Sequence, residues 1–240
     1  GEISLLKKAN DYSFKVNESK NKQSNIYWLE IIPNKFDKIN FIKKDNPHRK
    51  ENVFPIFIIG LPRCGSTLIE SIISSGKDKI ENLGETNLVN WAFLNTNRDV
   101  LFSFKTINEE NKINIDIEHT AKKLKDAFSN LKIHKEKKNI FSEKSLENFY
   151  YIDLILKIYP NAKFLNPFRN LLDNTFAIYK QFLSHVSWSH SLETILIYID
   201  NYLKSLDYFK KKYPDKILSI SLENLTKDPK AVSMEIYKFC

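Results

Sequence analysis

The sequence has little of what would mark a disulfide-braced or membrane-spanning protein. Its 240 residues include only two cysteines, so a disulfide framework does not organise the fold. No apolar run approaches the roughly 18 residues of a transmembrane helix, and no basic-then-apolar signal follows Gly1. His, Cys and Asp residues do not cluster at metal-ligand spacing, so we expect no metal. The chain starts without methionine and stops at Cys240. We therefore expect a fragment of a longer, cytoplasmic protein.

Apolar and basic residues, in contrast, are plentiful. Hydrophobic residues make up 42% of the chain and aromatic residues 13%, which is typical of a folded protein. The formal net charge is +8. A lysine-rich solvated surface would explain this charge, and so would attraction for a polyanion such as a nucleotide or a nucleic acid. Charge alone does not separate the two interpretations.

The pattern of the chain changes near residue 53. Residues 1–52 are polar and Lys/Asn-rich, and we expect a helical arm or linker. Beyond them, apolar stretches with strand character alternate with amphipathic helices, and this order predicts a P-loop-like three-layer α/β domain over residues 53–240, with a mainly parallel central sheet flanked by helices. The expected strands are 54–59, one ending near 83, 139–144, 162–168 and 216–221, and the expected helices are 67–75, 88–94, 117–131, 147–159, 170–182, 192–213 and one after Pro229.

The stretch "GLPRCGST" follows the first expected strand and opens a helix. This context and its two glycines resemble a P-loop, which binds phosphate through backbone N–H groups at a helix N-terminus. Ser66 occupies the position of the P-loop lysine, and Arg63 lies inside the loop. Backbone N–H groups from Cys64 to Thr67 are expected to face an anion. The missing lysine, with no clear Walker B aspartate, argues against a triphosphate hydrolase.

Several segments together resemble the sulfotransferase superfamily. They are "PIFIIGLPRCGSTLIESII", "LGETN", "SEKSLENF", "YPNAKFLNPFRNLLDNTFAIY" and "ILSISLENLTKDP", which lie in the order of the family's motifs. The likeness covers residues 53 to 240 and is greatest to bacterial domains that follow tetratricopeptide repeats and are related to tyrosylprotein sulfotransferases. It implies 3′-phosphoadenosine 5′-phosphosulfate (PAPS) as the sulfate donor and a hydroxyl-bearing acceptor (peptide tyrosine, saccharide or small molecule). It also implies possible tetratricopeptide repeats upstream.

The resemblance assigns roles to individual residues. Glu85 in "LGETN" matches the family's glutamate base, and Lys144 matches the lysine that meets the bridging oxygen of the leaving group. Arg63 is expected to reach the sulfonate, and Arg169 matches the arginine of the 3′-phosphate. The 5′-phosphosulfate is expected on the loop residues Arg63, Cys64, Gly65, Ser66 and Thr67.

The chain also departs from the family pattern. Ala177 replaces a serine that holds the 3′-phosphate, and Leu222 replaces an aromatic residue near the adenine. The segment that follows in many relatives, with further 3′-phosphate contacts, is missing after Cys240, so we expect a domain truncated at its C-terminus. His185 and His190 are the other candidates for the base.

Other interpretations stay open. Cys64 could be a reactive thiol at a helix N-terminus. The domain could be an atypical P-loop nucleotide or small-molecule kinase. It could also be a basic, non-catalytic binding or scaffold domain on the same fold.

Overall fold

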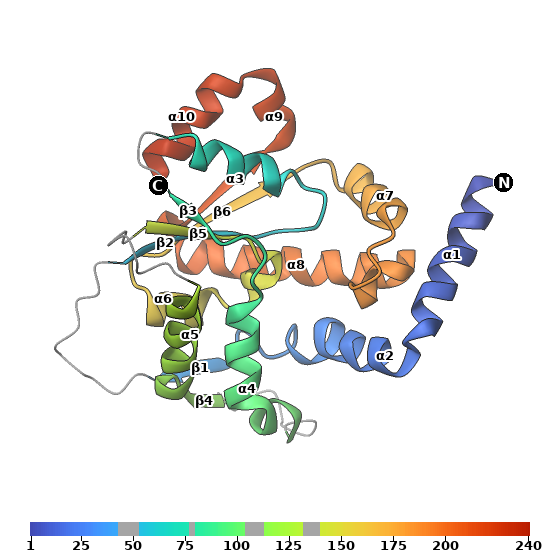
Figure 1. The fold of residues 1–240 in the computed structure, drawn as a ribbon, viewed down its shortest axis with the longest axis horizontal. Helices are drawn as coiled ribbons and strands as arrows, with labels where there is room; N and C mark the ends of the chain where they lie inside the picture. The colour runs from blue at the N-terminus through green and yellow to red at the C-terminus, as the bar shows by residue number, and fades with distance from the viewer. Residues whose placement is uncertain (43–52, 77–79, 104–112, 132–139) are drawn as a thin grey trace.

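A five-stranded parallel sheet forms the centre of the computed structural model, which describes residues 1–42, 53–76, 80–103, 113–131 and 140–240 (Figure 1). The strand order is β3-β5-β2-β6-β7, so consecutive strands are joined by crossovers. The strands are β2 (Phe54–Ile58), β3 (Glu81–Asn82), β5 (Ile140–Glu143), β6 (Lys163–Phe168) and β7 (Ile217–Ser221).

Helices cover both faces of this sheet (Figure 1). Because β2 is buried on both faces, its side chains pack in two hydrophobic cores. Phe57 packs in the larger core, and Ile56 and Ile58 pack in the smaller one. The smaller core lies under α3 (Ser66–Ser74), α9 (Leu222–Lys227) and α10 (Pro229–Phe239), and the larger one includes α6 (Ile152–Ile158) and α8 (Leu192–Lys212). The predicted α/β fold with a mainly parallel sheet is confirmed.

The N-terminal residues form structure that the sequence showed only in part. They form α1 (Glu2–Val16), α2 (Glu18–Ile26), a π-helical turn η1 (Tyr27–Ile31) and β1 (Ile39–Ile42). Side chains from η1 and β1, such as Tyr27 and Phe41, are buried in the larger core. The expected boundary at residue 52 lies outside the described residues.

Strand β1 pairs in parallel with β4 (Ile113–Asp116) in a separate two-stranded sheet, flanked by α4 (Leu88–Ser103) and α5 (Glu118–Asn130) (Figure 1). Neither strand was predicted. Across the described residues, no helix is both long and apolar enough to span a bilayer.

The helix expected over 147–159 is divided in two. A 3-10 turn, η3 (Leu146–Tyr150), comes first, and α6 follows after Tyr151, whose backbone (φ −110°, ψ 14°) is not helical. The aromatic residues here are buried, including Phe149 and Tyr151, so this run belongs to the core. The remaining elements are α7 (Leu171–Gln181), η4 (Ser187–His190) and η5 (Pro214–Lys216).

The strand order brings the site segments together. Strands β5, β2 and β6 are adjacent and parallel, so the residues that follow them meet at one edge of the sheet. The loop after β2, Lys144 after β5 and Arg169 after β6 are therefore neighbours at this edge.

Candidate active site

The loop between β2 and α3 has a backbone that requires its glycines. Gly60 has φ +142°, and a Cβ there would lie 3.2 Å from the carbonyl oxygen of Pro167. Gly65 has φ +92°, and a Cβ there would lie 2.8 Å from Cδ1 of Leu222. Arg63 also has a left-handed backbone, with φ 66°. Positive φ at a residue other than glycine is uncommon and is concentrated at functional sites.

Hydrogen bonds hold this loop in place from two sides. Asn174 of α7 donates its side-chain N–H to the carbonyl of Pro62 at 2.7 Å, and the N–H of Gly60 donates to the carbonyl of Leu146 at 3.0 Å. The loop ends at Gly65, the N-cap of α3, which has no side chain to satisfy the first-turn N–H groups. A fixed loop that leads into an uncapped helix N-terminus fits an anion.

The loop side chains divide into inner and outer ones. Cys64 and Ser66 are buried, whereas Arg63 and Thr67 are exposed. Burial raises the pKa of the Cys64 thiol to about 11, which disfavours the thiolate. The environment of Cys64 therefore argues against a reactive thiol, and its backbone is the part available to a ligand.

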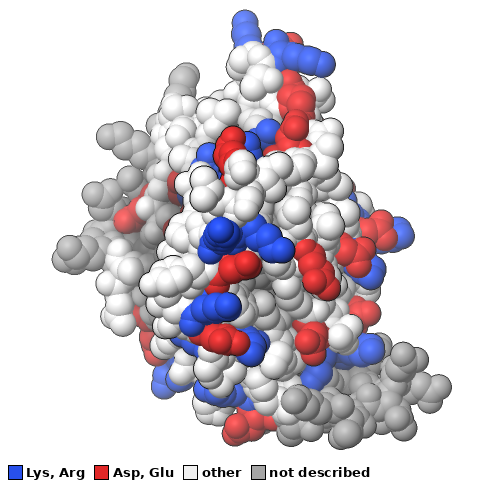
Figure 2. Space-filling view, turned by 90° about the vertical axis from the view of Figure 1, so that its right-hand side faces the viewer, with Lys and Arg blue, Asp and Glu red and all other residues white. Residues whose placement is uncertain are grey.

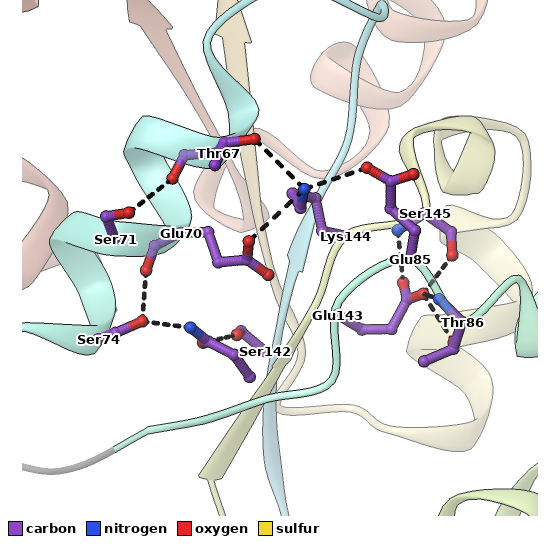
Figure 3. Close-up of polar contacts among 11 residues, drawn as sticks. Thr67, Glu70, Ser71, Ser74, Glu85, Thr86, Ser142, Glu143, Lys144 and Ser145 are labelled. Atoms are coloured by element: carbon purple, nitrogen blue, oxygen red, sulfur yellow. Dashed lines mark hydrogen bonds and ion pairs between the residues drawn. The ribbon is translucent and has the colours of Figure 1, made fainter. Parts of the chain in front are cut away.

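Lys144 lies at the centre of a polar corner beside the loop (Figure 3). Its Nζ is 3.1 Å from Oε1 of Glu85, 3.5 Å from Oε2 of Glu70 and 3.5 Å from Oγ1 of Thr67. The Lys144 side chain is 9% exposed and that of Glu70 is 16% exposed, whereas that of Glu85 is 58% exposed. The structure thus brings together three of the predicted residues, Thr67, Glu85 and Lys144. One cation faces two carboxylates.

A buried carboxylate supports this corner from behind. Glu143 accepts hydrogen bonds from Thr86 N–H (3.2 Å), Thr86 Oγ1 (2.8 Å), Ser145 N–H (3.0 Å) and Asn148 Nδ2 (2.6 Å), and it also contacts the Ser145 hydroxyl. Burial raises the pKa of Glu143, and these hydrogen bonds oppose the rise. Thr86 follows Glu85, and Ser145 follows Lys144, so Glu143 fixes both chain segments that carry the corner (Figure 3).

Sequence reasoning did not identify Glu70 or Glu143. Glu143 directly precedes Lys144 in the "EKSLEN" segment, and an acidic residue next to a candidate site lysine was the available signal. Glu70 lies one helical turn after Thr67 on the same face of α3, so helical spacing alone could have pointed to it.

Arg169 lies at the end of β6 on the other side of the loop. Its guanidinium is 3.9 Å from Asp173, and its side chain is 29% exposed. Asn170 caps α7 by accepting from Leu172 N–H, and its own N–H donates to Glu223 Oε1 at 2.8 Å. That bond lowers the pKa of Glu223, and the charge of Arg169 adds to the effect. Arg169 is thus followed directly by the N-terminus of α7, which the hydrogen bonds of Asn170 hold in place.

The two candidate histidines lie in surroundings that differ from those of the Lys144 corner. His190 is buried, its Nδ1 lies 3.2 Å from Oδ1 of Asn10, and its ring packs edge-on against Phe14 and Phe182. Burial lowers the pKa of His190. None of these partners belongs to the Lys144 corner. His185 forms no hydrogen bond, ion pair or ring contact with the corner among the described residues.

The positive net charge is not gathered on the side of the molecule in Figure 2, which is on the right in Figure 1. There Lys and Arg side chains are interspersed with Asp and Glu. This face therefore has no broad patch of one sign of the kind that a nucleic acid would need.

Comparison with known proteins identifies the family. A sequence model of the Sulfotransferase family matches residues 55–240, so the chain belongs to the sulfotransferase family. An "Uncharacterized protein" of Aquifex aeolicus (strain VF5) is 27% identical over 195 residues, which are 78% of this chain and 25% of that protein. The chain thus spans about a quarter of the length of this curated relative.

Solved structures share the fold. The sulfotransferase domain from the Synechococcus PCC 7002 olefin synthase has a TM-score of 0.50 at 18% identity, over 81% of this chain and 75% of that one. A sulfotransferase from Alicyclobacillus acidocaldarius also has a TM-score of 0.50, at 19% identity, over 77% of this chain and 79% of that one.

Proposed function

We propose that this chain transfers a sulfuryl group from PAPS to an acceptor hydroxyl by in-line displacement, with Glu85 as the base. The observation that carries the proposal is the position of Lys144. Its ammonium lies between the first turn of α3, where a lysine-free anion loop ends, and the exposed carboxylate of Glu85. That order of groups suits a reaction in which an anion on the loop meets a hydroxyl on the Glu85 side.

The donor would supply an activated sulfuryl group on a phosphate leaving group, and the loop would hold this anion. Backbone N–H groups of Cys64, Gly65, Ser66 and Thr67 would bind its phosphosulfate end, with the partial positive charge of the α3 N-terminus. Arg63, exposed on the loop, would contact the sulfonate oxygens. Arg169 would bind the 3′-phosphate.

Lys144 and Glu85 would divide the remaining work. Lys144 would stabilise negative charge on the bridging oxygen as it leaves. Glu85 would accept the proton of the acceptor hydroxyl, and its exposure leaves room for that hydroxyl to approach. Glu70 and Glu143 would orient the two groups without touching the substrates.

The finer assignments are predictions as well. We propose residues 53–240 as the catalytic unit and residues 1–52 as an arm. The acceptor is proposed to be a peptide tyrosine, a saccharide or a small molecule. Kinship with repeat-associated and tyrosylprotein sulfotransferases is proposed on the motifs of the sequence.

Thermal unfolding with three ligands tests the proposal. Adenosine 3′,5′-bisphosphate without metal, at about 100 times its dissociation constant, should stabilise the fold by about 2.7 kcal/mol. For a chain of this length that raises Tm by roughly 5–10 °C. Arg169→Ala should lose most of this shift, whereas Lys180→Ala, an exposed change on α7, should keep it.

Two results would overturn the proposal. Stabilisation by magnesium ATP that equals or exceeds that by the bisphosphate would favour an atypical kinase. Stabilisation by an oligonucleotide alone would favour a non-catalytic binding domain.

A further inference from the structure

A cavity of about 580 Å³ lies between the edge of the sheet at β6 and β7 and the helices α7 and α8. Leu61 and Cys64, at the base of the loop, form part of its wall. Arg63, Thr67, Glu85 and Lys144 do not line it. The cavity is therefore distinct from the polar corner.

Side chains of β6 point alternately to the two faces of the sheet, and the cavity lies on the face covered by α8. Leu165 points into the core under α3 and α10, so Asn166 points the other way, and it accepts a hydrogen bond from the Tyr202 hydroxyl of α8 at 2.8 Å. Asn166 also donates to Ser219 of β7 at 3.3 Å. These three polar groups line the cavity and are bonded to one another.

The rest of the wall is mainly apolar, and its mouth is open to solvent. Leu206 is buried in the wall, whereas Leu203, Phe168 and Leu171 are 40–42% exposed. A pocket of several hundred Å³ with an apolar wall and a few polar groups is typical of a small-molecule site.

Three charged side chains border the cavity, and two of them already have partners. Arg169 lies near Asp173, and the Glu223 carboxylate accepts from Asn170 N–H and from the Ser221 hydroxyl. Lys210 is different: among the described residues its ammonium forms no ion pair, and its nearest acidic neighbour in sequence, Asp207, is paired with Lys211 at 2.7 Å. Partial burial lowers the pKa of Lys210.

The positions along the chain separate the two cations. Arg169 follows the carboxyl end of β6, whereas Lys210 lies near the end of α8, which leads through η5 into the start of β7. The cavity thus extends from the loop edge of the sheet back along α8 to Lys210, whose ammonium forms no ion pair among the described residues, although the charge of Asp207 opposes the effect of burial on its pKa.

We propose that this cavity binds a small amphipathic carboxylate, with its carboxylate at Lys210 and its apolar body against Leu203 and Leu206. The ammonium of Lys210 complements the negative charge of the carboxylate. The polar groups of Asn166, Ser219 and Tyr202 are already hydrogen-bonded to each other, so the body of the ligand would make apolar contacts. The proposed occupant would touch the base of the loop through Leu61 and Cys64. The cavity shares Cys64 and Arg169 with the proposed donor site, but the proposal rests on its Lys210 end.

Isothermal titration calorimetry with decanoate, decanol and decylamine, without nucleotide, tests this site. The three probes share one chain length and differ in charge, so decanoate should bind most tightly and decylamine least tightly. Lys210→Met should weaken decanoate about tenfold and leave decanol within twofold. Leu203→Trp, at the exposed mouth, should weaken both probes at least tenfold.

Lys204→Met is the matched control, because it removes an equal charge from the same helix, at an exposed side chain that pairs with Asp200 and does not line the cavity. It should leave all three affinities unchanged. Equal affinity for the three probes, or decanoate binding that neither Lys210→Met nor Leu203→Trp changes, would overturn the proposal. Far-UV circular dichroism confirms that each variant is folded, and the thermal shift with the bisphosphate reports separately on the donor site.

Discussion

From the Lys144–Glu85 ion pair we predict that transfer rate and donor affinity respond in opposite directions to one substitution. Glu85→Gln keeps the shape of the side chain but removes its ability to accept a proton at neutral pH. Transfer should fall by about 10²–10⁴, the usual contribution of a general base. Donor affinity should rise, because the ammonium of Lys144 is released from one carboxylate and can turn toward an anion on the loop.

The size of the second effect follows from distance and exposure. Two unit charges 3.1 Å apart attract by about 5 kcal/mol at an effective dielectric constant of 20. The Glu85 side chain is 58% exposed, so solvent screens most of this attraction and leaves about 1 kcal/mol or less. Donor affinity should therefore rise no more than about fivefold.

Glu70→Gln separates the two roles. It removes the other carboxylate near Lys144, at 3.5 Å and only 16% exposed, while Glu85 stays in place as the proposed base. Donor affinity should rise by a similar or greater factor, and transfer should stay within about tenfold of the wild type. Lys144→Ala should weaken donor binding and slow transfer.

Single-turnover sulfate transfer and a donor titration on each variant provide the measurement. Near-normal transfer by Glu85→Gln would refute Glu85 as the base. Unchanged donor affinity in both glutamine variants would refute the placement of Lys144 beside the donor.

Three further predictions follow from the loop and its surroundings. Ala177→Ser should tighten bisphosphate binding by roughly 0.5–1.5 kcal/mol in a calorimetric titration, because it restores a hydroxyl on the helix that Arg169 leads into; no gain would show that the 3′-phosphate lies elsewhere. Gly65→Ala should lower the free energy of urea unfolding by about 1–3 kcal/mol, since φ is +92° and Leu222 is too close for a Cβ, and a second change, Leu222→Ala, should recover only the contact part. Burial raises the pKa of Glu147 from 4.5 to about 7, so the folded state holds this proton more tightly than the unfolded state does, and its contribution to stability falls as pH rises through that window. Glu147→Gln should therefore flatten the decrease in unfolding free energy between pH 4.5 and pH 7, and an unchanged slope would contradict the assignment.

Residues placed directly after strands could be predicted from the sequence. Arg63, Glu85, Lys144 and Arg169 each come shortly after a strand, and parallel strands place such residues at one edge of a sheet. The pairing of Lys144 with Glu85 then depends on β3 and β5 being neighbours, which only the fold reveals. The candidate residues could thus be named from the sequence, whereas their contacts depend on the strand order.

Other features depend on contacts that have no local signal. β1 and β4 are each four residues long and pair across a large sequence separation, so neither strand could be recognised alone. The role of Glu143 likewise depends on Thr86, which comes from a different strand connection. The cavity at Lys210 requires α8 and β6 to be placed against each other.

Leu222 shows why a departure from a family pattern has to be judged in three dimensions. The resemblance predicts that Leu222 replaces an aromatic residue that would lie near the adenine of the donor. In the structure, Leu222 is the first residue of α9 and packs against Gly65, the N-cap of α3, so that the starts of two helices meet at the loop. Ser221 caps α9 by accepting from Asn224 N–H at 3.2 Å, which fixes the position of Leu222. Leu222 therefore still packs against the loop at Gly65, although it supplies no aromatic ring.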